Sequence, residues 1–137
     1  MQQLSREHHA ALVFARKIEL AESGEGIRLL AKAVPDYFSA ELAPHFYLEE
    51  TQLLPQLAIA GYPLLVDRVL EEHGCLRELL RQIARDNEDD HTSDNSEMNM
   101  KTFGKKLSLH VRFEERELFA VAQTVLSDDF LQFASDI

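Results

Sequence analysis

Two six-residue stretches decide the fold of this chain: HFYLEE at positions 45–50 and HVRFEE at positions 110–115. Each places a histidine four residues before a glutamate, so both side chains project from one face of a helix, about one turn apart. The two stretches are 65 residues apart, and the same offset relates His8 to His73. The chain is therefore an internal repeat, and each copy carries two histidines and one glutamate.

The repeat extends to residues of other types. At the same offset, identical residues occur in the pairs Glu7/Glu72, Arg16/Arg81, Ile18/Ile83, Phe38/Phe103, Leu42/Leu107, Glu50/Glu115 and Leu53/Leu118. A duplicated pair of helices that cannot bury its own apolar face packs on its copy. We therefore expect one domain over residues 1–137, with repeat halves of about 3–60 and 63–126.

Apolar residues at spacings of three and four predict amphipathic helices. The helices are expected over about 3–22, 35–60, 63–85 and 97–126, with a short C-terminal helix containing Phe130, Leu131 and Phe133. Pro55 should kink the second helix or end it early. Residues 86–96 are polar and acidic, which is typical of a solvated loop. Short connections then favour an all-α, up-down-up-down four-helix bundle.

Composition restricts the possible partners. The net charge of −10 disfavours nucleic acid and anionic membranes. We expect no signal peptide and no membrane span, because no run of about 18 apolar residues occurs. A lone cysteine, Cys75, suits a reducing cytoplasm, and is expected to be a small buried side chain.

Six side chains lie on the predicted interior stripes and could bind metal. They are His8, His45, Glu49, His73, His110 and Glu114. Imidazole supplies terminal nitrogen ligands and a carboxylate can bridge two cations, so the set is sufficient for a dinuclear site of iron, manganese or zinc. A buried carboxylate without a partner would cost several kcal/mol in a domain whose stability is about 5 to 15 kcal/mol.

Neighbouring residues have less definite roles. His9 and His91 do not follow the repeat. We assign His9 to the helix surface, or to contact with a ligand, and His91 to the loop. Glu50 and Glu115 repeat, so they could orient histidines, pair with arginine or be solvated. The phenylalanines at positions 38, 46, 103, 113 and 119 are expected in the core, where they would exclude water from the site.

The sequence resembles the hemerythrin-like HHE cation-binding domains over residues 3–122. The resemblance lies in EHHAAL at 7–12, HFYLEE at 45–50, EH at 72–73 followed by LR at 76–77, and HVRFEE at 110–115. It implies a four-helix bundle with a non-haem di-iron centre, bridged by two carboxylates and an oxo or hydroxo group. Carried over, the ligands are His8, His45, Glu49, His73, His110 and Glu114.

One position departs from the oxygen-carrying hemerythrins, which place a further histidine where this chain has Arg77. The six-ligand set is closer to the di-iron domain of iron–sulfur-cluster repair proteins, which respond to nitric oxide and oxidative stress and add an N-terminal cysteine-bearing segment that we do not expect here. A missing ligand leaves a coordination position open to water or substrate. Arg77 itself is expected at the surface, with its charge in water.

The sequence therefore predicts a non-haem di-iron protein that interacts with O2, peroxide or nitric oxide in sensing, stress response or iron handling. One alternative is a redox-inactive module that binds zinc or manganese, with residues 86–96 as the contact for a protein partner. Another is an enzyme of the di-iron oxidase or peroxidase type. The sequence does not decide whether the chain is an enzyme.

Overall fold

The computed structural model describes residues 2–89 and 94–126, and all the regular structure in these ranges is helical. The elements are α1 (Gln2–Leu20), α2 (Glu25–Tyr37), η1 (Phe38–Leu42), α3 (Ala43–Leu48), η2 (Glu49–Leu53), α4 (Leu54–Ile59), α5 (Pro63–Glu88), α6 (Asp94–Phe113), η3 (Glu114–Leu118) and α7 (Phe119–Val125). The η elements are single π-helical turns. Because α2 to α4 are continuous, and α6 to α7 likewise, the described residues form four helical segments. The all-α class is confirmed.

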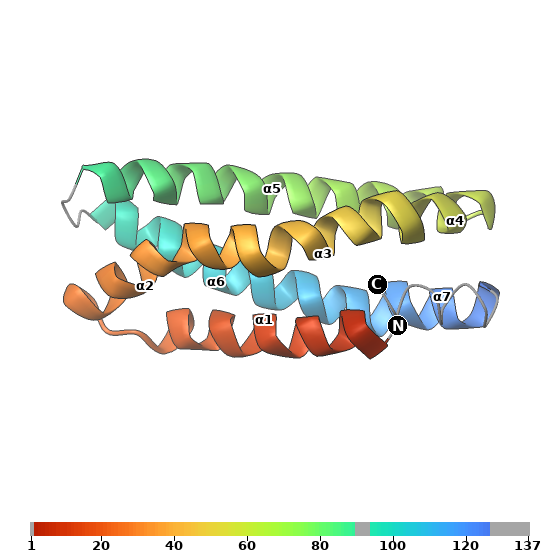
Figure 1. The fold of residues 1–137 in the computed structure, drawn as a ribbon, viewed down its shortest axis with the longest axis horizontal. Coiled ribbons are helices and arrows are strands. Elements are labelled where there is room, and N and C mark those ends of the chain that lie inside the picture. The colour runs from red at the N-terminus through yellow and green to blue at the C-terminus, as the bar shows by residue number, and fades with distance from the viewer. Residues whose placement is uncertain (1, 90–93, 127–137) are drawn as a thin grey trace.

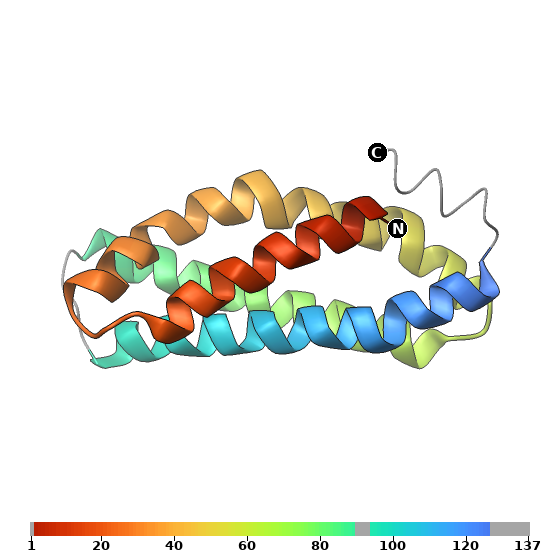
Figure 2. The same ribbon diagram turned by 90° about the horizontal axis from the view of Figure 1, so that it is seen from below.

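The four segments lie side by side along the long axis of a helical bundle (Figures 1 and 2). Segment α1 packs on α6, and α5 packs on both α6 and α2. Turns between segments use glycine with positive φ, at Gly24 (φ 89°) and Gly61 (φ 98°), where a side chain would be strained. No helix within the described ranges is long and apolar enough to cross a membrane.

The second segment begins ten residues before its expected start at Pro35, because α2 begins at Glu25. Ile27 and Val34 explain the difference, since they lie two turns apart on one face and are both buried. Their burial outweighs the backbone donor that Pro35 lacks inside the helix. Pro55 does not end this segment early, because the helix continues to Ile59.

Both prolines of this segment's middle part follow a π-helical turn. Pro44 lies in the first turn of α3, directly after η1, and Pro55 lies in the first turn of α4, directly after η2. A π turn shifts the ladder of backbone hydrogen bonds by one residue, as when the Leu54 N–H donates to the Glu49 carbonyl. A proline in the first turn after this shift can be accommodated without ending the helix.

Two apolar clusters fill the interior, one on each side of a polar layer. On α1, Leu4 belongs to one cluster and Ala11 to the other, with His8 between them. On α5, Val69 and Leu76 are divided in the same way, and His73 lies between them. The five phenylalanines expected in the core are all buried. The fold therefore surrounds one histidine layer with apolar side chains from both sides.

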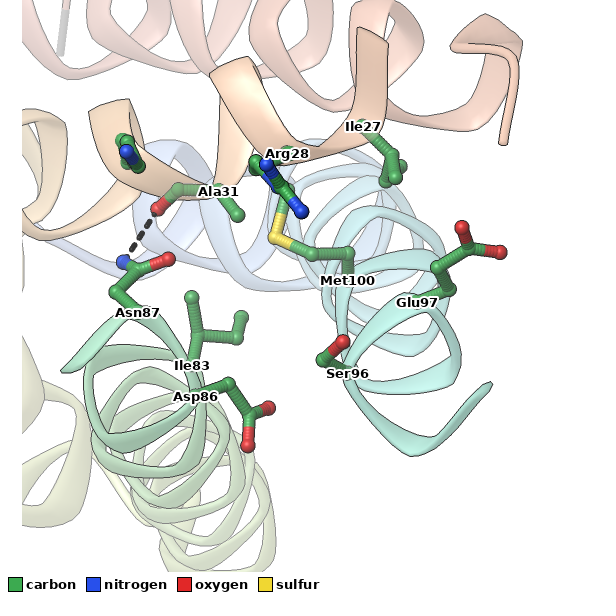
Figure 3. A pocket seen from close by; sticks show the side chains of 10 residues that line it. Ile27, Arg28, Ala31, Ile83, Asp86, Asn87, Ser96, Glu97 and Met100 are labelled. Atoms are coloured by element: carbon green, nitrogen blue, oxygen red, sulfur yellow. Dashed lines mark hydrogen bonds between the residues drawn. The ribbon is translucent and has the colours of Figure 1, made fainter. Parts of the chain in front are cut away.

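The end of the bundle nearest the α5–α6 connection closes around Ile27, Ile83 and Met100, which line a cavity of about 30 Å³ (Figure 3). Asn87 Nδ2 donates to the Ala31 carbonyl at 2.8 Å, so α5 continues past its expected end at Arg85. Residues 86–88 and 94–96, which were expected in the acidic loop, are helical. His91 and the expected C-terminal helix lie outside the described residues.

Candidate metal centre

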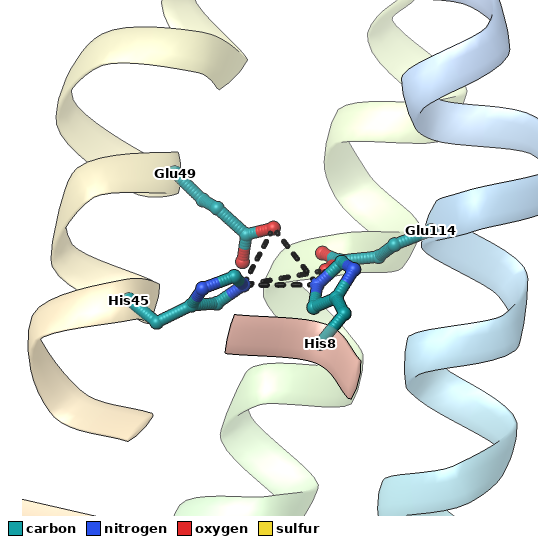
Figure 4. Close-up of side chains that lie close together, drawn as sticks. All are labelled: His8, His45, Glu49 and Glu114. Atoms are coloured by element: carbon teal, nitrogen blue, oxygen red, sulfur yellow. Dashed lines mark hydrogen bonds and ion pairs between the residues drawn. The ribbon is translucent and has the colours of Figure 1, made fainter. Parts of the chain in front are cut away.

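The structure brings the six predicted ligands together in the polar layer. They form two groups, His8, His45, Glu49 and Glu114, and Glu49, His73, His110 and Glu114, and within each group one ligand atom per residue lies within 4.8 Å of the others. Figure 4 shows the first group, with its side chains converging from three helical segments. All six residues are 0–3% exposed. Both groups contain the same two glutamates.

Each glutamate directs one oxygen to each group. Glu49 Oε2 lies 3.3 Å from His45 Nε2, and Glu49 Oε1 lies 3.2 Å from His73 Nε2. Glu114 repeats the arrangement, because Oε1 lies 2.7 Å from His8 Nε2 and Oε2 lies 3.3 Å from His110 Nε2. A carboxylate with one oxygen directed to each of two sites is placed to bridge two cations.

Both glutamates lie at the start of a π-helical turn. Glu49 begins η2 and Glu114 begins η3, so the π turns are 65 residues apart, as the repeat is. Proline does not explain η3, because Ala120 stands where the first half has Pro55. The shared feature is the glutamate, and π turns occur frequently at functional sites. No feature of the sequence other than the repeat indicates these turns.

A second carboxylate lies behind each histidine, on the side away from the centre. His8 Nδ1 donates to Glu115 at 2.9 Å, His73 Nδ1 to Glu50 at 2.6 Å, and His110 Nδ1 to Glu72 at 2.7 Å. His45 Nδ1 lies 3.6 Å from Glu7. Because an ionised carboxylate only accepts, the three bonded histidines carry a proton on Nδ1, and Nε2 faces the centre.

These four carboxylates follow the repeat, since Glu7 corresponds to Glu72 and Glu50 to Glu115. Glu50 and Glu115 were expected to orient histidines, pair with arginine or be solvated. Both contact a histidine, and Glu50 also pairs with an arginine. Glu7 and Glu72 carried no predicted role, although they form one of the repeated pairs. Their recurrence at the common offset was the signal that could have identified them.

The Arg77 side chain is 36% exposed, so it stays at the surface as expected, but its charge is paired with a carboxylate instead of extending into water. Its guanidinium donates to both oxygens of Glu50, at 2.9 and 3.2 Å, and lies 5.5 Å from the centre of the Phe46 ring. The planar fork of arginine matches a carboxylate, and Arg77 lies one helical turn after His73, whose Nδ1 also donates to Glu50, so the ion pair holds the Arg77 side chain beside the site. Arg68 contacts Glu72 in a similar way, with Nε 3.0 Å from the carboxylate.

Aromatic rings close both groups against water. His8 stacks on Phe119, with ring centroids 4.8 Å apart and planes inclined by 10°. His73 stacks on Phe46 at 3.8 Å and 12°. Stacking and the Nδ1 hydrogen bonds together fix the orientation of each ring.

The buried carboxylates determine the ionisation of the histidines. Burial lowers the pKa of His110, but the charge of Glu114 and its hydrogen bond outweigh this effect and raise the pKa to about 10. The pKa values of His8, His45 and His73 are raised for the same kind of reason, against the effect of burial. Burial raises the pKa of Glu114, but His110 and its other histidine neighbours lower it well below the usual range.

The donor atoms fit a cation. Six buried side-chain atoms in the described ranges have no hydrogen-bond partner: His45 Nδ1, both oxygens of Glu49, His73 Nε2, His110 Nε2 and Glu114 Oε2. All six belong to the predicted ligand residues, and five of them face the centre, because His45 Nδ1 faces Glu7 instead. Each such atom costs about 1–3 kcal/mol when left unsatisfied. Nitrogen and carboxylate oxygen donors together suit a transition metal.

Two neighbouring residues lie outside this arrangement. His9 is on the exposed surface of α1, in agreement with the surface assignment. The expectation that Cys75 is buried is wrong, because its side chain is exposed. Cys75 is two residues from His73, and a rotation of about 200° around the helix axis takes it away from the interior.

Comparison with known families agrees with this geometry. Residues 1–122 match the model of the hemerythrin HHE cation-binding domain. The chain belongs to the hemerythrin HHE family, whose domains bind cations. No curated protein and no solved structure gives a significant match.

Proposed function

We propose that the chain binds two iron ions through His8, His45, Glu49, His73, His110 and Glu114, and that the bound centre interacts with O2, peroxide or nitric oxide. The observation that carries the proposal is the placement of Glu49 and Glu114, each with one oxygen directed to each pair of histidines. One cation needs fewer donors than this set supplies. Two ions sharing both carboxylates use every donor.

The surrounding residues have distinct tasks in this proposal. Glu115, Glu50 and Glu72 accept the Nδ1 protons and keep Nε2 available to the metal. Phe46 and Phe119 exclude water from the histidine rings. When bound, iron supplies redox chemistry and a position for a small ligand.

Arg77 supports a role other than reversible oxygen carriage. Oxygen-carrying hemerythrins have a histidine at this position, whereas Arg77 is occupied by its pairing with Glu50 and supplies no ligand nitrogen. The proposal therefore includes an open position on the His73–His110 side. If these residues held iron, O2 that reached this position would be the oxidant, and we would expect lasting oxidation of the metal and no releasable oxygen.

The test is anaerobic reconstitution with ferrous iron, followed by elemental analysis and an absorption spectrum after exposure to air. We expect about two irons per chain and near-ultraviolet charge-transfer bands. At most one equivalent of iron would contradict the dinuclear proposal. Two equivalents of zinc or manganese in preference to iron, with no such bands, would favour the redox-inactive module, and turnover of peroxide would favour an enzyme.

Three further elements belong to the same proposal. The chain is one domain with two repeat halves, and successive segments alternate in direction, which the sense of the colour gradient along them in Figure 1 supports. The cytoplasmic location rests on the lone cysteine and stays a prediction. No protein partner is identified.

A further inference from the structure

A groove runs along the outside of the bundle between α5 and the α6–η3 segment. Its volume is about 700 Å³, within the range of sites that hold small organic molecules. Glu72 and His110 form part of its wall, so the groove lies on the outer side of the candidate centre. The cavity beside His8 and His45, by contrast, has a volume of about 10 Å³.

The groove is positively charged in a chain of net charge −10. Its wall includes Arg68, Lys106, Arg112 and Arg116. The two carboxylates of the wall, on Glu72 and Glu117, both pair with Arg68. The formal charge of the wall is therefore four minus two, or +2.

Three of the cations remain available for a ligand. Within residues 2–89 and 94–126, the side chains of Lys106, Arg112 and Arg116 form no ion pair with a carboxylate. This charge is specific to one face, because the positions 65 residues earlier are Glu41, Tyr47 and Thr51. The repeat that builds the centre therefore does not account for these cations.

The remaining wall is apolar. Leu76 and Phe113 are buried beneath it, and Leu109 is 55% exposed within it. The Arg68 guanidinium lies 3.7 Å above the Phe113 ring and forms a flat cationic surface. An apolar body could cover Leu109 while an acidic group approaches Lys106 or Arg112.

We propose that this groove binds a small organic anion with an apolar body and a carboxylate, sulfonate or phosphate group. Charge complementarity selects the anion, and the volume together with the apolar wall selects an organic molecule over an inorganic ion. The site does not depend on which metal the centre holds. Its occupant would lie against Glu72, the carboxylate that accepts the His110 Nδ1 proton.

The test is an NMR titration of the 15N-labelled, zinc-loaded protein with naphthalene-1-sulfonate, alongside the uncharged naphthalene-1-sulfonamide. We expect saturable shifts at the backbone amides of Cys75, Leu109 and Phe113 with the sulfonate, and at least tenfold weaker binding of the sulfonamide. Equal binding of both would overturn the selection of an anion. Absence of binding by either would overturn the site.

Two adjacent lysines provide matched variants. Lys106→Glu reverses a charge in the groove wall, whereas Lys105→Glu makes the same change at an exposed position outside it. We expect at least tenfold weaker sulfonate binding for Lys106→Glu and less than a twofold change for Lys105→Glu. Equal losses in both would show general electrostatic attraction and overturn the proposal. Binding of an oligoglutamate peptide without the sulfonate would overturn it in favour of a peptide surface.

Discussion

The two halves of the repeat present the same groups to the centre but different charges behind them. Glu7 lies behind His45 and Glu115 lies behind His8, and neither carboxylate pairs with an arginine among the described residues. Behind His73 lies Glu50, which pairs with Arg77, and behind His110 lies Glu72, which pairs with Arg68. The positions equivalent to these arginines are Leu12 and Gln3.

The repeat therefore duplicates the orientation of the histidines but not the charge behind them. The donor atoms and the carboxylates behind them are duplicated, so both halves can orient imidazoles toward a cation. The arginines are not duplicated, so the two carboxylates behind His8 and His45 have no arginine beside them among the described residues, whereas each carboxylate behind His73 and His110 has one. The ligand residues are thus duplicated, and the charges behind them are not.

The largest effect is expected from a glutamate that both halves share. Glu114→Ala should reduce metal content from about two ions to less than one, because each cation position loses a donor. His73→Ala removes a donor from one half only and should retain about one ion. Elemental analysis after reconstitution measures both, with His9→Ala as a control that keeps two. Equal losses from Glu114→Ala and His73→Ala would contradict the sharing of the carboxylate.

Removal of metal should reveal a pH dependence that both halves share. A histidine whose folded pKa is raised contributes stability below its unfolded value of about 6.5, and this contribution is lost as the pH rises through the folded value. For His110 the window extends to a pKa of about 10. The metal-free protein should therefore melt at least about 5 °C lower at pH 9.5 than at pH 7.

The metal-loaded protein should not follow this trend, because bound histidines are already deprotonated at Nε2. Cations and protons compete for the same nitrogens, so metal affinity should rise between pH 6 and pH 8. Thermal melts and zinc titrations at each pH measure the two effects. A metal-free melting temperature that rises toward pH 9.5 would contradict the assignment.

A carboxylate behind a histidine should matter in one half at a time. Glu115→Gln removes the ionised acceptor from His8 and should weaken one of the two binding steps about 10–100-fold. Glu50→Gln should do the same through His73 in the other half. Calorimetric zinc titration resolves the steps, and Glu71→Gln, at an exposed position on α5, is the control. Weakening of both steps by either variant would show that the halves are not separable.

The smallest effect is expected from the arginine that distinguishes the halves. Arg77→Leu removes a positive charge from the surroundings of one cation, while His73 still donates to Glu50. Zinc should therefore bind a few-fold more tightly in one step, within the range of about 1 kcal/mol for a partly exposed ion pair. Arg81→Leu removes a charge from the same helix, where the partner is the exposed Glu78, and should leave both steps unchanged. Weaker binding in Arg77→Leu would show that orientation of Glu50 outweighs its charge.

The sequence predicted most of the helical segments correctly. Helical periodicity predicted four segments, and these form, although the second starts early at Glu25 and the third continues to Glu88. The starting point of the second segment depends on burial of Ile27 and Val34 against other segments. Spacing along one helix shows its apolar face but does not show where a neighbouring helix covers that face.

The sequence by itself determined which six side chains meet, because the 65-residue offset fixes equal positions in two helical pairs. Their role as metal ligands stays a prediction. Only the tertiary structure decided the pairing of Arg77 with Glu50, the exposure of Cys75 and the cationic groove beside His110. The physical reason is that a sequence repeat predicts only those contacts that occur in both of its halves. A contact between unrelated positions on different helices depends on how those helices pack.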